Sequence, residues 1–203
     1  MPETGRLRTV VLFASTTAFI LLGISIRLHA FVDLDRAALH WFESQRTATR
    51  TVIALAVTTL GSDVVTLGIV GIVAMSIRKL SRYWMNRLLV TVSSGLVLNE
   101  ILKFIFYRKR PEFSHPLLHL YTNSFPSGHA QAATVLYGTL IILTISLAES
   151  RVLRIAVIPF GIIMIFLISV SRLYLGVHYL SDVIGGVLEG IAWVNAVGIF
   201  FDR

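Results

Sequence analysis

Residues 153–170 read LRIAVIPFGIIMIFLISV, and the only charged side chain in this stretch is Arg154, at its second position. A helix needs about 20 predominantly apolar residues to cross the roughly 30 Å hydrocarbon core of a bilayer. A stretch so long and so uniformly apolar does not fit the water-facing surface of a soluble protein. It therefore predicts a membrane-spanning helix.

Five further stretches have the same character, and all six together predict an all-α integral membrane bundle of six transmembrane helices. The five cover residues 10–30, 52–77, 88–106, 130–147 and 183–201. Of the 203 residues, 55% are hydrophobic and 14% are charged, whereas soluble domains average about 25% charged residues. This composition excludes a soluble globular domain and a disordered chain, and the absence of Cys excludes disulfides and thiolate chemistry. No linker or repeat divides the chain, so we expect one domain over residues 1–203.

The basic residues predict the orientation of the bundle. A net charge of +7 would indicate nucleic acid as the partner of a soluble protein, but in a membrane protein it indicates positive-inside loops. Lys and Arg are denser in the short connections on the side of the termini, above all at Arg78, Lys79, Arg82 and Arg87. We expect a multi-pass protein of the cell (inner) membrane with both termini in the cytoplasm and no nucleic-acid partner.

Residues 33–50, after the first predicted span, form an amphipathic segment. Its apolar residues are Phe31, Leu34, Leu39, Trp41 and Phe42, which alternate with Asp35, Arg36, His40 and Glu43. A helix of this kind lies flat in the membrane interface. Two interpretations remain open: it flanks a route by which a lipid enters, or it only seals the bundle.

A first polar cluster, KFIFYRKRP at residues 103–111, ends the third span. Lys103 and Arg110 are seven residues apart, close to two helical turns, so they should share one face of a helix that ends near Pro111. Two cations at the membrane surface can clamp a phosphate. The alternative is that they anchor the span by snorkelling, a role that fits Arg108 and Lys109 better.

A second cluster, FPSGH at residues 125–129, directly precedes the fourth span. Ser127 can cap the helix, and Gly128 allows a close approach of backbone to a ligand. A helix N-terminus suits an anion, and His129 would project from the first turn toward it. An ordinary capped helix start is the alternative.

The third cluster, SRLYLGVHYLSD at residues 171–182, connects the last two spans. His178 and Asp182 are four residues apart and would be neighbours in a helix. A carboxylate on one imidazole nitrogen fixes the tautomer and leaves the other nitrogen free to attack. Arg172 adds a third cation. The alternative is a polar loop with a helix-capping Asp. With six spans, all three clusters fall on the outer face.

These clusters resemble the three signature motifs of the type 2 phosphatidic acid phosphatase family. Lys103-x6-Arg110-Pro111, Pro126-Ser127-Gly128-His129 and Ser171-Arg172-x5-His178-x3-Asp182 are complete and in order. Related vanadium haloperoxidases share the motifs but are soluble, so the six spans disfavour that branch.

The resemblance implies a role for each residue. His178 would attack phosphorus and form a phosphohistidine, Asp182 would orient His178, and His129 would protonate the leaving oxygen and then activate water. The phosphate would be held by Lys103, Arg110, Arg172, Ser127 and Gly128. No cofactor and no metal are implied.

The predicted function is that of a membrane phosphatase acting on a lipid phosphate that enters from the bilayer to an external site. Undecaprenyl diphosphate is the lead substrate, before phosphatidylglycerol phosphate and phosphatidic acid. One alternative is a phosphotransferase with an acceptor lipid. Another is a non-catalytic lipid-phosphate binder or transporter, which the combination of His129, His178 and Asp182 argues against. The sequence predicts no oligomeric state.

A few polar residues lie outside the motifs. Glu100 is expected to pair with Lys103, Asn99 to hydrogen-bond across helices, and Asp63 to cap or kink a helix. Glu189 has no assigned role. His115 and His119 either shape head-group selectivity or belong to a solvated loop.

Overall fold

The computed structural model describes residues 3–112, 117–118 and 120–202, and within these residues the chain forms eight helices and no strand. In chain order they are α1 (Glu3–Arg27), α2 (Val32–Ser44), α3 (Ala48–Thr59), α4 (Asp63–Ile77), α5 (Arg82–Phe106), α6 (Gly128–Leu147), α7 (Arg151–Tyr174) and α8 (Leu180–Phe201). The predicted all-α membrane fold is confirmed. His115 and His119 lie outside the described residues.

Five helices, α1 and α5 to α8, are each long and apolar enough to cross a membrane. Helices α3 and α4 meet the same criterion together, but they are bent by 49° with respect to each other. The span predicted over residues 52–77 is thus two helices that together form one bent candidate span, and the cap or kink expected at Asp63 lies where α4 begins. Ser62 caps α4 by accepting a hydrogen bond from the Val65 amide at 3.4 Å. A Cβ atom at Gly61 would lie 2.5 Å from Ile168 Cγ2, so only glycine permits this approach to α7.

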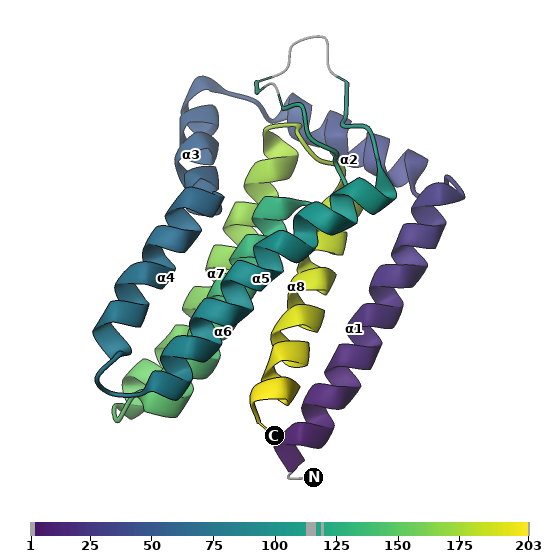
Figure 1. The fold of residues 1–203 in the computed structure, drawn as a ribbon. Helices are drawn as coiled ribbons and strands as arrows, with labels where there is room; N and C mark the ends of the chain where they lie inside the picture. The colour runs from purple at the N-terminus through teal and green to yellow at the C-terminus, as the bar shows by residue number, and fades with distance from the viewer. Residues whose placement is uncertain (1–2, 113–116, 119, 203) are drawn as a thin grey trace.

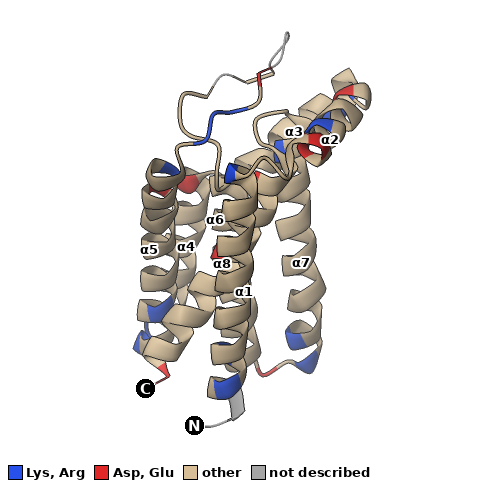
Figure 2. Ribbon diagram, turned by 90° about the vertical axis from the view of Figure 1, so that its right-hand side faces the viewer, with Lys and Arg blue, Asp and Glu red and all other residues tan. Residues whose placement is uncertain are grey.

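The spans alternate in direction, and both ends of the chain lie at the same end of the bundle (Figure 1). Asp202 ties these ends together, because its carboxylate lies 2.9 Å from Arg8 Nε and 3.0 Å from Arg87 Nη1. Helix α2 lies across the opposite end (Figure 1), as the amphipathic segment predicted. The charged residues gather toward the two ends of the bundle (Figure 2).

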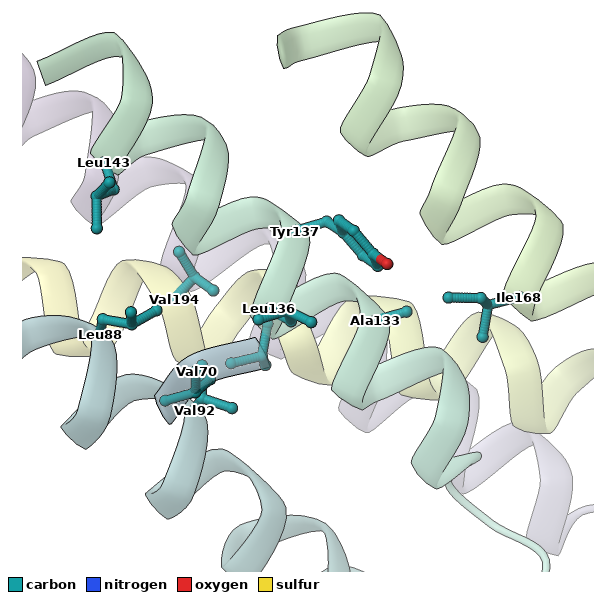
Figure 3. Packing of buried hydrophobic residues seen from close by; sticks show 10 residues of the cluster. Val70, Leu88, Val92, Ala133, Leu136, Tyr137, Leu143, Ile168 and Val194 are labelled. Atoms are coloured by element: carbon teal, nitrogen blue, oxygen red, sulfur yellow. The ribbon is translucent and has the colours of Figure 1, made fainter. Parts of the chain in front are cut away.

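The core of the bundle surrounds α6, which packs against α5, α7 and α8. Figure 3 shows the main apolar cluster, which includes the fully buried Leu88, Leu136 and Ile168. On the outside, large apolar side chains such as Phe104 and Phe166 are exposed, at 80% and 63%. Lipid tails accommodate such residues without the cost that water would impose. The packed core thus holds the ends of α5 to α8, which carry the three polar clusters.

Candidate active site

Lys103 and Arg110 do not share a helical face, contrary to the prediction. Helix α5 ends at Phe106, and Tyr107 adopts a left-handed conformation with φ of 48° while its amide donates to the Lys103 carbonyl. Arg110 therefore lies in the connection between α5 and α6. Its Nη1 donates to the Val177 carbonyl at 2.7 Å and lies 3.1 Å from His178 Nε2. The fold, not helical spacing, brings Arg110 to the third cluster.

Lys103 is buried in the last turn of α5, and its Nζ lies 2.6 Å from Glu100 Oε1. This ion pair confirms the prediction for Glu100. Gly128, the first residue of α6, faces the same amino group, because a Cβ there would lie 3.0 Å from Lys103 Nζ and from Asn99 Oδ1. The glycine therefore allows the Lys103 ammonium to reach the start of α6.

Ser127 precedes α6 at the cap position, but its side chain makes no capping hydrogen bond. The predicted capping role of this hydroxyl is wrong. Its Oγ is buried and has no hydrogen-bond partner among the described residues. The backbone instead fixes this point, since the Ser127 amide donates to the Asp182 carbonyl at 3.0 Å. The hydroxyl is left available for a ligand.

His178 and Asp182 are neighbours, although they do not lie in one helix as predicted. His178 precedes α8, Asp182 lies in its first turn, and Nδ1 is 3.5 Å from Oδ2. Both side chains are buried, at 1% and 0% exposure. Burial lowers the pKa of His178 to about 4; Asp182 opposes this shift, and the charges of Arg110 and Arg172 add to it. The imidazole is therefore neutral at neutral pH.

Arg172 and His129 complete the cluster. Arg172, in the last turn of α7, donates from Nη1 to Thr58 Oγ1 of α3 at 2.6 Å. Its Nε is buried and unpaired among the residues that the structure covers. His129 interacts electrostatically with Arg172 and His178, and also with Lys103 and Arg110. The eight predicted site residues thus converge at the end of the bundle opposite the termini.

This arrangement has a counterpart among known proteins. A family model described as the PAP2 superfamily matches residues 83–203, which include all three clusters and nearly all of α5 to α8. The chain belongs to the PAP2 superfamily. The resemblance that the motifs indicated is confirmed.

Relatives of this PAP2 chain include a phosphatidylglycerophosphatase B of Bacillus subtilis, 29% identical over 176 residues that cover 85% of this chain and 86% of the relative. An undecaprenyl-diphosphatase of Sulfolobus acidocaldarius is 32% identical over 117 residues, which cover 55% of this chain and 52% of the relative. The undecaprenyl-diphosphatase BcrC of Bacillus subtilis is 29% identical over 118 residues, covering 56% and 54%.

Two crystal structures have a similar fold. One is a transmembrane PAP2-type phosphatidylglycerolphosphate phosphatase from Bacillus subtilis, with a TM-score of 0.87 and 26% identity over 94% of this chain and 96% of that one. The other is LpxE of Aquifex aeolicus, with a TM-score of 0.64 and 22% identity over 81% and 94%. The second likeness concerns the fold alone.

The PAP2 site also contains residues that the motifs do not include. Arg108 was expected to anchor the span, but its Nη1 lies 2.5 Å from Asp182 Oδ1 and its Nη2 lies 2.8 Å from Asp35 Oδ2. Ser124 Oγ donates to the same Asp182 carboxylate. One signal could have identified Asp35: it lies one turn before Leu39, and both are buried on the inner side of α2. For Arg108 the sequence offers no such signal.

The remaining polar residues have simpler roles. Asn99 donates to Glu189 Oε2 at 2.8 Å, which confirms a hydrogen bond across α5 and α8 and gives Glu189 a partner. Asp63 is the first residue of α4, after the capping Ser62. Over the described part of the chain, no three His, Asp or Glu side chains are grouped so that they could hold a metal ion.

Proposed function

We propose that this chain is a membrane-embedded lipid phosphatase that acts through a phosphohistidine at His178. The observation that carries the proposal is the environment of that imidazole. It is buried and neutral, its Nδ1 faces Asp182, and its Nε2 lies 3.1 Å from Arg110. A neutral imidazole held in one tautomer beside cations is suited to attack a phosphate.

The reaction takes two steps. His129 lies among the cations Arg172, Lys103 and Arg110 and is neutral until the phosphate monoanion of the substrate transfers its proton to it. His178 Nε2 attacks phosphorus, and the bond from phosphorus to the lipid oxygen breaks as His129 gives that proton to the lipid oxygen. A water molecule then loses a proton to His129 and attacks the phosphohistidine, and the P–N bond breaks. The inorganic phosphate leaves with the proton held by His129, so both histidines return to their starting states.

The cations supply the electrostatic part of catalysis. Lys103, Arg110 and Arg172 stabilise the charge that develops on the phosphoryl oxygens, which is the main requirement of phosphoryl transfer. Arg110 also donates to the Thr122 carbonyl at 2.7 Å and to the Asn123 carbonyl at 3.3 Å. These bonds hold the guanidinium in place, and its contact with His178 Nε2 gives way when phosphorus approaches that nitrogen.

A cavity of about 740 Å³ lies beside the site, between α1, α2 and the α5–α6 connection. Its lining includes Arg27, Arg36 and Arg110 together with the apolar Phe106 and Phe125, and also the carboxylates Glu43 and Glu112. Arg108 lines it as well, but its guanidinium is held by Asp35 and Asp182. Basic and apolar groups together suit a lipid head group and the start of its tail. We propose that the substrate tail stays in the bilayer while the phosphate reaches Arg110 from this cavity.

We place phosphatidylglycerol phosphate first among the candidate substrates, because a relative that aligns over 85% of this chain is a phosphatidylglycerophosphatase B. Undecaprenyl diphosphate, the lead from the sequence, comes second, because the undecaprenyl-diphosphatases align over about half of the chain. Phosphatidic acid is the third candidate.

Phosphate release from these three lipids tests the proposal. Purified protein in detergent with EDTA should release phosphate with the highest kcat/KM for phosphatidylglycerol phosphate. His178→Ala should abolish release, while Lys79→Ala, at an exposed residue between α4 and α5 and at the opposite end of the bundle, should not reduce it. Activity that survives in His178→Ala would overturn the nucleophile, and dependence on added Mg²⁺ would overturn the metal-free mechanism.

Reaction in ¹⁸O-labelled water separates hydrolysis from phosphotransfer. A phosphatase places one ¹⁸O atom in each released phosphate. Transfer of the phosphate to an added acceptor lipid, without ¹⁸O incorporation, would favour the phosphotransferase alternative.

We further propose that the site faces the outside of the cell membrane and that both chain ends face the cytoplasm, as the distribution of basic residues supports. The chain has no Cys, so single cysteines report the side directly. Asp33→Cys, in α2, should react with an impermeant maleimide on intact cells, and Lys79→Cys, between α4 and α5, should react only after permeabilisation. The opposite pattern would invert the orientation.

A further inference from the structure

Arg108 bridges two buried carboxylates that come from opposite halves of the chain. Its Nη1 lies 2.5 Å from Asp182 Oδ1 in α8, and its Nη2 lies 2.8 Å from Asp35 Oδ2 in α2. Asp35 and Asp182 are 1% and 0% exposed. Buried negative charges are costly without an opposite charge, and the guanidinium between the two carboxylates supplies it.

Asp35 also reaches the start of α8 directly. Its Oδ1 accepts from the Ser181 amide at 2.9 Å, and its Oδ2 accepts from Ser181 Oγ at 2.6 Å. The first turn of a helix has amide groups without intrahelical partners, and Asp35 satisfies one of them from another helix. Helix α2 is thereby fastened to the turn that contains Asp182.

The two oxygens of Asp182 have different partners. Oδ2 accepts from the Tyr179 amide at 2.9 Å and from Ser124 Oγ, and it faces His178 Nδ1 at 3.5 Å. Among the described residues, the side-chain partner of Oδ1 is Arg108. The guanidinium itself stacks on the Tyr179 ring, with Cζ 4.3 Å from the ring centroid. By holding Oδ1, Arg108 fixes the rotation of the Asp182 carboxylate about its Cβ–Cγ bond. This rotation sets the position of Oδ2 relative to the His178 imidazole.

We propose that Arg108 and Asp35 are positioning residues, which hold Asp182, and through it His178, in the geometry needed for attack. They act on catalysis without contact to the phosphate. The inference rests on the proposed function of His178 and extends it to α2, a helix that carries none of the three signature clusters.

Steady-state kinetics with phosphatidylglycerol phosphate test the inference. Arg108→Gln should lower kcat about 10- to 100-fold, because a small misalignment of reacting groups has effects of this size, while KM changes less than about threefold. Asp35→Asn should act in the same direction, and Arg108→Lys, which keeps the charge but not the two-pronged geometry, should recover part of the loss. The double variant Arg108→Gln/Asp35→Asn should be no slower than the slower single variant, because the two residues form one chain of contacts.

A matched control comes from a neighbouring exposed residue that does not line the cavity. Asp33→Asn removes the other early carboxylate of α2 and should keep kcat within about twofold. Thermal unfolding establishes that the variants are folded. Folded Arg108→Gln with unchanged kcat, or with a raised KM and unchanged kcat, would overturn the inference.

A second measurement does not need turnover. In protein labelled with ¹⁵N-histidine, the signals of His178, identified by their loss in His178→Ala, report its tautomer and hydrogen bonding. They should change in Arg108→Gln and stay unchanged in Asp33→Asn. Absence of turnover in the wild type would refute the proposed function alone, whereas identical His178 signals in Arg108→Gln and the wild type would refute the positioning role.

Discussion

Arg110 and His178 face each other across 3.1 Å, from Nη1 to Nε2. The residues are 68 positions apart in the chain, and neither lies in a helix. The cation lies beside the nitrogen that attacks phosphorus in the proposed mechanism. In that mechanism, we expect this proximity to couple phosphate binding to the protonation of His178.

The first prediction concerns the acid limb of the pH profile. Burial lowers the pKa of His178 to about 4, and Arg110 contributes to the decrease. The neutral imidazole is the reactive form in the proposed mechanism, so protonation of His178 should reduce activity only below about pH 4. Arg110→Gln removes a charge that lowers the pKa, so the pKa of His178 should rise and the acid limb of kcat/KM should move to higher pH. The change should also lower kcat/KM at least about 100-fold, through loss of a transition-state contact.

The profile of kcat/KM against pH, measured from pH 4 to 9, checks this prediction. Lys109→Gln should keep the limb of the wild type. A limb that stays fixed in Arg110→Gln, or that moves to lower pH, would contradict the coupling.

The second prediction separates binding from capping at two serines. The Ser127 hydroxyl is buried and caps nothing, whereas Ser150 Oγ caps α7 by accepting from the Leu153 amide at 3.3 Å. Ser127→Ala should therefore lower kcat/KM about 10-fold with little loss of stability. Ser150→Ala should lower the unfolding free energy by about 1 kcal/mol and preserve kcat/KM. Denaturation and kinetics on the same preparations provide both values, and a large loss of stability in Ser127→Ala would refute the distinction.

The third prediction concerns the approach of Lys103 to α6. Gly128→Ala would place a methyl group 3.0 Å from Lys103 Nζ, whereas at Gly138, in the same helix, the nearest atom is Val194 Cγ2 at 3.8 Å. The end of a lysine moves easily, so we expect Gly128→Ala to fold normally and to lose at least about 10-fold in kcat/KM. Gly138→Ala should be active and as stable as the wild type or more so, since alanine favours helices. Equal activity in the two variants would show that the approach of Lys103 to α6 does not depend on Gly128.

The fourth prediction concerns the buried pair of Asn99 and Glu189. Glu189 is 3% exposed and accepts from Asn99 Nδ2 at 2.8 Å. Glu189→Gln keeps an acceptor for Asn99 and should leave stability nearly unchanged. Glu189→Ala leaves a buried amide without its partner and should lower the unfolding free energy by about 1–3 kcal/mol. Equal thermal midpoints for the two variants would show that the hydrogen bond contributes nothing.

The spans were predictable because each follows from a local constraint, whereas the motif residues were grouped by their resemblance to a known family. Bilayer thickness sets the length of an apolar helix, and this constraint is visible in residues 153–170. A cap or kink at Asp63 was expected after Gly61 and Ser62, but the 49° angle between α3 and α4 depends on the contact of Gly61 with Ile168 of α7, which the sequence does not show. The adjacency of His178 and Asp182 was predicted from helical spacing, but the structure achieves it with a loop residue and a helix start.

The part of the site that was not predicted from the sequence depends on contacts between distant segments. The sequence near a membrane surface does not distinguish a basic residue that snorkels from one that bridges buried carboxylates. Arg108 bridges two buried carboxylates. Asp35 was assigned to the polar side of an amphipathic segment, yet it is buried against Ser181, 146 positions away. For Arg108 only the assembled fold distinguishes these cases, whereas for Asp35 the one-turn spacing from the apolar Leu39 was the single signal in the sequence.

The match to the family covers residues 83–203, yet two side chains from before that segment reach the site: Asp35 from α2 and Thr58 from α3. Segments outside the family match therefore supply part of the support of the site. A chimera that exchanges the first half of the chain between relatives must preserve both Asp35 and Thr58.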